Sequence, residues 1–182
     1  MFNESRKVYL LKPLEERKNT EATDKLKKYK NNFPMKYFDK IMINKLHNIE
    51  GCTIEEINFI EESINKKIPG ALREYLLYFG HKQNIFLEWD LHGCNDMIEI
   101  YNNFNYWVNI YESKNIDMSN QKNIIPFYNC LDTTFYLNLN GSDDPEVLAI
   151  DIGDEPTIRK LGDNFSGFIK YVIEKRLKGE NW

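Results

Sequence analysis

The fold of this chain is decided by the stretch GCTIEEINFIEESINKKIPGALREYLLYFG, residues 51–80. Within it, Thr53 followed by Glu56 is a capping-box pattern: the hydroxyl accepts from a first-turn amide, and the carboxylate accepts from the amide of the cap residue. The isoleucines at positions 54, 57, 60 and 64 then recur at helical spacing and form one apolar stripe. We therefore predict a helix that begins after Thr53 and packs against a core.

The second half of this stretch predicts a corner and another helix. Pro69 disfavours helical geometry for Ile68 and can itself open the next helix, where its missing amide is harmless. Leu72 and Leu76 belong to the apolar stripe of that helix, and Gly80 stands where a left-handed cap is expected. Two helices that meet at Ile68-Pro69 follow from this pattern.

Glu61 lies at the edge of the first stripe. We expect its carboxylate to accept backbone amides of a neighbouring loop, since many side-chain hydrogen bonds in proteins go to the backbone. A role as an interface or ligand residue is the alternative.

The remainder of the chain mixes strand and helix patterns, which predicts a single α+β domain. Pro126 places its strand at an edge or a strand end, and Asn140-Gly141 predicts a tight turn between two antiparallel strands. The expected elements are a strand over 85–90, an aromatic-rich helix over 97–111, strands over 124–128, 133–139 and 147–152, and a last helix capped by Asp163 or Asn164.

Charge is distributed unevenly along the chain. Residues 1–50 hold 12 Lys and Arg against 7 Asp and Glu, whereas residues 51–182 hold 12 against 21. We place a basic N-terminal extension over residues 1–33 and the folded domain over residues 34–182. The acidic domain should attract basic partners and repel nucleic acid.

Three cysteines, Cys52, Cys94 and Cys130, are widely spaced and form no Cys-x-x-Cys pair. We expect buried thiols in a reducing cytoplasm. No run approaches the roughly 20 apolar residues of a membrane helix, so we expect no signal peptide, no membrane segment and a cytoplasmic location.

Catalytic and metal-binding patterns are weak. His47, His81 and His92 are isolated in the sequence, and the Asp-rich stretch at 151–155 lacks the spacing and the terminal glutamate of a calcium loop. We therefore expect no enzyme activity, no metal and no cofactor. A hydrolase that uses the Asp-rich turns is the least favoured alternative.

The order of these blocks resembles the SUKH superfamily, which joins the yeast cell-wall synthesis regulator to many bacterial toxin-immunity proteins. The resemblance covers about residues 50–175. The family's usual Leu-Pro and Asn-Gly pairs here read Ile68-Pro69 and Phe79-Gly80, so the second pair departs from the pattern. This resemblance implies a twisted, mainly antiparallel sheet with helices packed largely on one side. The matching blocks are Thr53, Ile57, Glu61, Ile64, Ile68-Pro69 and Gly80, then 124–127, 134–139, 147–151 and Asn164-Phe165.

The resemblance implies an immunity protein that neutralises a cognate bacterial toxin, with a nuclease the favoured class. A non-enzymatic regulatory or scaffold module that binds a cellular protein is the alternative. We expect a monomer or weak homodimer whose partner is a basic toxin domain, with no nucleic acid or membrane bound. The predicted partner-binding residues form an acidic surface with one aromatic anchor: Glu88, Trp89, Asp90, Asp143, Asp144, Asp151, Asp154 and Glu155.

Overall fold

The computed structural model describes residues 35–46, 49–82, 85–86 and 91–180. The predicted extension over residues 1–33 lies outside them, as does His47. The elements are α2 (Lys40–Ile43), α3 (Ile54–Ile64), α4 (Gly70–Phe79), β1 (Leu91–His92), α5 (Met97–Ser113), the 3-10 helix η1 (Ser119–Gln121), β2 (Ile124–Cys130), β3 (Thr133–Asn138), β4 (Val147–Asp151), β5 (Thr157–Gly162) and α6 (Phe165–Leu177).

The strands form one open sheet in the order β1-β2-β3-β4-β5, and every neighbouring pair is antiparallel. This confirms the α+β class and the antiparallel sheet. In the register of β3, β4 and β5, Thr133 faces Asp151 and Asp151 faces Thr157. The β2–β3 and β4–β5 turns therefore lie at the same end of the sheet.

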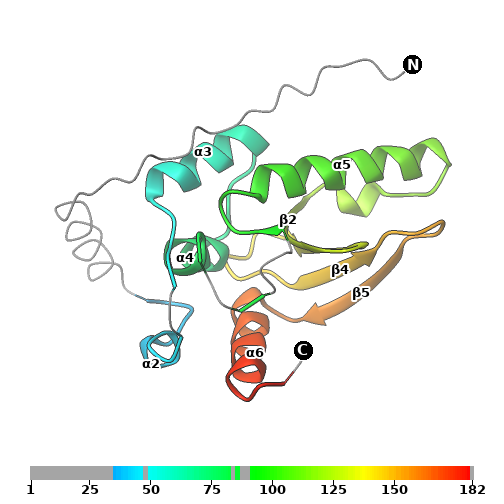
Figure 1. Ribbon diagram of the computed structural model, residues 1–182. Helices are drawn as coiled ribbons and strands as arrows, with labels where there is room; N and C mark the ends of the chain where they lie inside the picture. Colours follow the sequence, from blue (N-terminus) through cyan, green and yellow to red (C-terminus); the bar gives the residue numbers. More distant parts are fainter. Residues whose placement is uncertain (1–34, 47–48, 83–84, 87–90, 181–182) are drawn as a thin grey trace, which may run out of the picture. The chain divides into compact units, whose positions relative to one another are not determined.

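Most of the helices contribute to one core, as expected, since α3, α4 and α6 all supply buried residues to it, while α5 covers the other face of the sheet. Phe135 on β3 belongs to the main core with α4 and α6, whereas its neighbour Tyr136 belongs to a second core under Phe104 and Val108 of α5. Successive side chains of a strand point to opposite faces, and here both sets are apolar. Each face therefore needs a helical cover, and Figure 1 shows α5 and α6 on opposite sides of the sheet.

The capping box at the start of α3 is confirmed. The Glu56 N–H donates to Thr53 Oγ1 at 3.2 Å, and the Thr53 N–H donates to Glu56 Oε2 at 2.8 Å. Of the predicted stripe, Ile57, Ile60 and Ile64 are buried and Ile54 is half-buried.

The corner between α3 and α4 is also confirmed, and Glu61 holds it. The Ile68 N–H donates to Glu61 Oε1 at 2.8 Å, so the expected backbone bond is present. Glu61 Oε2 also lies 2.7 Å from the Arg73 guanidinium of α4 and 3.0 Å from Lys67 Nζ. Burial disfavours the charged carboxylate, but the Ile68 amide and the two cations outweigh it and lower the pKa of Glu61.

Gly80 does not adopt the predicted left-handed cap. Its backbone is right-handed, with φ −66°, and the reason for glycine is space. A Cβ at this position would overlap the sulfur of Cys52 and lie 2.6 Å from the Leu76 carbonyl oxygen. The left-handed glycine of this region is Gly93, with φ +77°, and a Cβ there would overlap the carbonyl oxygen of Gly80.

The expectation of three thiols is wrong for two of the cysteines. Cys52 and Cys94 form a disulfide, with their Cα atoms 6.5 Å apart, and Cys130 is not part of it. Both paired cysteines follow a glycine, and both glycines let their backbones approach the last turn of α4 closely. Sequence spacing could not show this pairing, because the two segments are 42 residues apart.

Two strands differ from the prediction. Residues 85–86 lie in a bend, residues 87–90 fall outside the described residues, and the first described strand is Leu91–His92. The sequence pattern did not predict β5, whose first four residues are exposed and show no apolar alternation. Pro126 lies in β2 beside a β-bulge, in a part of the strand that the short β1 does not reach.

We predict that Glu61→Gln lowers the free energy of unfolding by about 1–2 kcal/mol at pH 7, because a neutral amide replaces a charge-assisted acceptor in a partly buried network. The pKa of Glu61 is lower in the folded chain than its ordinary value of 4.5. Its contribution is therefore complete above about pH 4.5 and is lost as the pH falls through the folded-state pKa.

Urea unfolding at pH 7 and pH 3 measures this difference. The difference in the free energy of unfolding between Glu61→Gln and the unchanged chain should be smaller at pH 3 than at pH 7. An equal difference at both pH values would contradict the role given to Glu61. Glu62→Gln, at an exposed position of the same helix, is the matched control and should change little.

Candidate protein-binding surface

The predicted acidic residues fall on two opposite ends of the sheet. Asp151, Asp154 and Glu155 lie at the β4–β5 turn, whereas Asp143 and Asp144 lie in the β3–β4 connection at the other end. The five residues of β4 separate the two groups by about 15 Å at the usual rise of a strand. Glu88, Trp89 and Asp90 lie outside the described residues.

Asp144 serves the local structure. Its carboxylate accepts from the Ser166 N–H at 2.8 Å and from the Ser166 hydroxyl at 2.6 Å. It thereby satisfies a first-turn amide of α6, which Asn164 caps by accepting from the Gly167 N–H at 2.7 Å. Its neighbour Asp143 is different: its side chain is 71% exposed and lies 3.6 Å from Lys36 Nζ.

The other end of the sheet carries four carboxylates, one at the end of β4 and three in the two turns, and we call Asp132, Asp151, Asp154 and Glu155 the acidic end. Asp132, Asp154 and Glu155 are exposed. The Ile152 N–H donates to the Asp132 carbonyl oxygen at 2.7 Å, which ties the β4–β5 turn to the β2–β3 turn. Figure 1 shows the β4 and β5 strands running out to this shared end.

The β4–β5 turn is also held from α5. The Tyr111 hydroxyl donates to the Gly153 carbonyl oxygen at 2.9 Å and accepts from the Gly153 N–H at 3.1 Å. Tyr111 is 1% exposed, so its ring is fixed in the second core. The neighbouring carboxylates of Asp154 and Glu155 therefore stand on an anchored turn.

Asp151 is the best-supported carboxylate of the acidic end. It accepts from the Thr133 hydroxyl at 2.6 Å and from Arg159 Nε at 3.2 Å. The Thr133 hydroxyl and then the Arg159 guanidinium lower the pKa of Asp151. The carboxylate thus stays ionised and fixed in direction.

Sequence reasoning missed Leu131 and Asp132, which form the β2–β3 turn. Leu131 is 87% exposed and has φ +51°, a conformation that a leucine side chain rarely adopts. In the sequence, the signal for this turn was an apolar residue next to an aspartate, located between two predicted strands. Leu131 thus presents an aliphatic side chain among the carboxylates of the acidic end.

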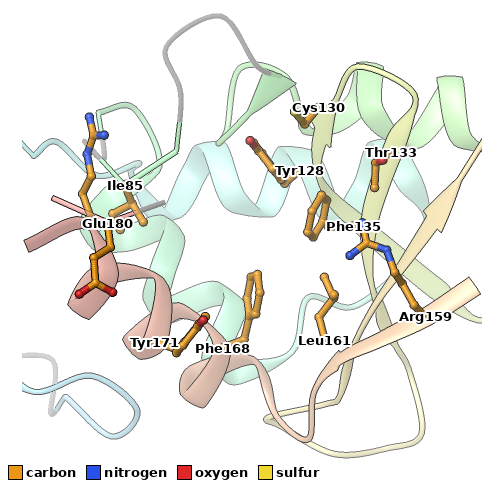
Figure 2. Close-up of a pocket in the computed structure, with 11 residues that line it drawn as sticks. Ile85, Tyr128, Cys130, Thr133, Phe135, Arg159, Leu161, Phe168, Tyr171 and Glu180 are labelled. Carbon is orange, nitrogen blue, oxygen red and sulfur yellow. The ribbon is translucent and has the colours of Figure 1, made fainter. Parts of the chain in front are cut away.

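A hollow of about 530 Å³ adjoins the acidic end on the face that α6 covers. Figure 2 shows Phe135, Phe168 and Leu161 around this space, with Arg159 at one side and Glu180 at the other. Thr133 and Arg159 line the hollow and both contact Asp151, so the two features are continuous. The full lining is Ile85, Tyr128, Cys130, Thr133, Phe135, Arg159, Leu161, Phe168, Tyr171, Arg176 and Glu180.

The hollow is largely apolar. Its lining is mostly aromatic and aliphatic, and Arg159, Arg176 and Glu180 add charged groups to it. An apolar hollow beside a charged rim is the arrangement that receives an anchoring side chain of a protein partner.

A capped helix, a proline corner and a second helix, packed with an antiparallel sheet and further helices, define a domain of the α+β class. The model of the SMI1 / KNR4 family (SUKH-1) matches residues 51–171, and the chain belongs to this family. Members are commonly toxin-immunity proteins and are generally non-catalytic immunity or regulatory proteins. The matched range runs from Gly51 to Tyr171 and includes the whole acidic end.

A search of curated proteins finds no match for the chain. Among the helices that the structure describes, every one is too short or too polar to cross a lipid bilayer.

We predict that Asp144→Ala lowers the free energy of unfolding by about 1–2 kcal/mol, because it leaves the Ser166 amide at the start of α6 without its acceptor. Asp143→Ala is the matched control, since its exposed ion pair contributes little and should change stability by less than about 0.5 kcal/mol. Urea unfolding of both variants gives the comparison. Equal effects would show that Asp144 has no special structural role.

Proposed function

We propose that this protein is an immunity protein that binds and neutralises a cognate toxin through the acidic end, and that the toxin is a nuclease. The observation that carries the proposal is the presence of four carboxylates and the exposed Leu131 at one end of the sheet, in a chain of the SMI1 / KNR4 family. Catalysis by this chain has no part in the mechanism.

Electrostatics support a nuclease as the partner. An enzyme that cuts RNA or DNA presents cations to the phosphate backbone. The carboxylates of Asp132, Asp154 and Glu155 can occupy the positions that phosphates would take in such a cleft. Attraction between the two surfaces also accelerates association, so that the toxin is captured before it reaches its substrate.

The hollow supplies the apolar part of the interface in this proposal. An aliphatic or aromatic side chain of the toxin would enter between Phe135, Leu161 and Tyr171, while Leu131 would contact the toxin beyond the rim. Apolar anchors of this kind usually carry most of the binding energy of an interface, and surrounding charges set its specificity and rate.

The proposed complex pairs this chain, as a monomer or weak homodimer, with a basic toxin domain in the cytoplasm. Asp143 and Glu88-Trp89-Asp90 stay predictions as further partner contacts. A regulatory or scaffold role toward a cellular protein is the alternative that the same family membership allows.

Co-expression tests the function directly. A toxin gene that lies beside the gene for this chain would be induced with and without the protein, and we expect the protein to restore growth of cells that express the toxin. Full toxicity in the presence of the folded protein would overturn the immunity function. A stable complex with a cellular protein that has no toxic activity would favour the regulatory alternative.

We predict that the double reversal Asp154→Lys/Glu155→Lys slows association with the toxin at least about tenfold at low salt. The difference in association rate between the variant and the unchanged chain should become smaller as salt is added, because exposed charges are screened. Stopped-flow kinetics at several ionic strengths give both quantities.

The matched control is Glu62→Lys/Asp163→Lys, which changes the net charge equally at two exposed positions outside the acidic end. This control should retain the association rate. A loss confined to the control would place the interface away from the acidic end, and equal losses would show a response to net charge alone.

We predict that Tyr171→Ala raises the dissociation rate of the toxin complex about tenfold, with little dependence on salt, because it removes an apolar wall of the hollow. Tyr171 is 51% exposed, so the fold should tolerate the change. Tyr106→Ala, at a 61% exposed position of α5, is the matched control. An unchanged dissociation rate for Tyr171→Ala would exclude the hollow from the interface.

A further inference from the structure

Four side chains of types that commonly bind metal ions lie near the last turn of α4. Cys52 precedes the cap of α3, Glu56 lies in the first turn of α3, His81 follows α4, and Cys94 precedes α5. These residues come from three segments of the sequence, which is why spacing alone gave no metal motif.

The potential ligand atoms of three of these side chains lie close to one another. One ligand atom each of Cys52, Glu56 and His81 lies within 4.8 Å of the other two, and His81 Nε2 is 3.1 Å from Glu56 Oε2. The sulfur of Cys94 is bonded to that of Cys52. The three ligand atoms of Cys52, Glu56 and His81 are therefore close together, and Cys94 adjoins them through its bond to Cys52.

Zinc matches this ligand set. Zn²⁺ binds thiolate sulfur at about 2.3 Å and imidazole nitrogen or carboxylate oxygen at about 2.0–2.2 Å in a tetrahedron. Around one such ion, a nitrogen and an oxygen ligand stand about 3.3 Å apart and two sulfurs about 3.8 Å apart. The His81–Glu56 pair already has nearly this separation, whereas the two sulfurs must give up their bond and move apart.

We propose that Cys52, Cys94, His81 and Glu56 bind one Zn²⁺ when the disulfide between the two cysteines is reduced. The chain would then hold the same junction in two ways, by a disulfide under oxidising conditions and by a zinc ion under reducing ones. This inference is independent of the proposed toxin interface, which lies on other elements.

A dithiol can act as the reductant of the Cys52–Cys94 disulfide. Thiol–disulfide exchange transfers two electrons to the Cys52–Cys94 bond, giving two thiols and the oxidised cyclic disulfide of the reductant. Zinc then displaces one proton from each thiol, and the two thiolates, the neutral His81 imidazole and the Glu56 carboxylate complete its four ligands.

The backbone around the group is already ordered, which favours binding. The Cys52 N–H donates to the Leu76 carbonyl oxygen at 2.9 Å, and the Cys94 N–H donates to the Gly80 carbonyl oxygen at 2.8 Å. The Thr53 N–H donates to Glu56 Oε2 at 2.8 Å and directs that carboxylate. Such outer bonds orient the ligands of a metal site.

Access is available from one side. Cys52 and Cys94 are 2% and 8% exposed, so the sulfurs lie inside the fold. The side chains of His81 and Glu56 are 22% and 37% exposed. A zinc ion would therefore reach the thiolates past the imidazole and the carboxylate.

The test uses the full chain, reduced with a phosphine that is then removed, and Zn²⁺ alone as the probe. Competition with a chromophoric chelator gives stoichiometry and affinity, and Co²⁺ substituted for Zn²⁺ reports tetrahedral geometry and thiolate ligation by its absorption spectrum. We expect one ion per reduced chain, no binding by the oxidised chain, and a higher Tm for the reduced chain when zinc is added.

Two variants keep both cysteines in place and so remain informative even if a cysteine variant fails to fold. Glu56→Gln preserves the capping box, which accepts Gln as well as Glu, and His81→Ala removes the imidazole. Each should weaken zinc binding at least about 100-fold. His92→Ala and Cys130→Ser are matched controls and should bind as the unchanged chain does.

Three results would overturn the proposal. These are no zinc bound by the reduced, folded chain, zinc affinity that Glu56→Gln and His81→Ala leave unchanged, or a Co²⁺ spectrum without thiolate bands. Equal binding by the oxidised chain would show that the ion sits elsewhere.

Discussion

The close approach of three backbone segments at the end of α4 is the constraint on which the rest of the structure depends. Cys52 and Cys94 each donate an N–H to this last turn, at Leu76 and Gly80. The start of α3 and the start of α5 are thereby fixed against one helix end, and Gly51 and Gly93 leave no room for a side chain there. With its start fixed, α5 in turn covers the second core and reaches one end of the sheet through Tyr111.

Local chemistry made the α3–α4 unit predictable. Thr53 and Glu56, three residues apart, exchange hydrogen bonds with each other's backbone amides. Pro69 restricts the backbone conformation of Ile68, and Glu61 accepts from the Ile68 amide seven residues later. Each of these interactions is set within a few positions of sequence, so a single sequence carries its signal. The family resemblance rested on the same residues, and the match over residues 51–171 agrees with it.

Features that depend on distant segments could not be read in this way. The Cys52–Cys94 pairing and the spatial reason for Gly80 arise only after three segments meet. β5 lacked a signal because its exposed edge position needs no apolar alternation. The acidic residues looked like one surface in the sequence, yet strand direction sends Asp144 to the start of α6 and Asp154 to the opposite end. Asp132 joins Asp154 for the same reason.

Tyr111 links the second core to the acidic end through both polar backbone atoms of Gly153. A surface turn normally samples many conformations, and a partner that selects one of them loses affinity to the entropy of ordering. With its backbone held by a buried phenol, the β4–β5 turn has already lost most of that freedom on folding. In the proposed interface, helix α5 would contribute to recognition without touching the toxin, because Tyr111 holds the β4–β5 turn before any partner binds.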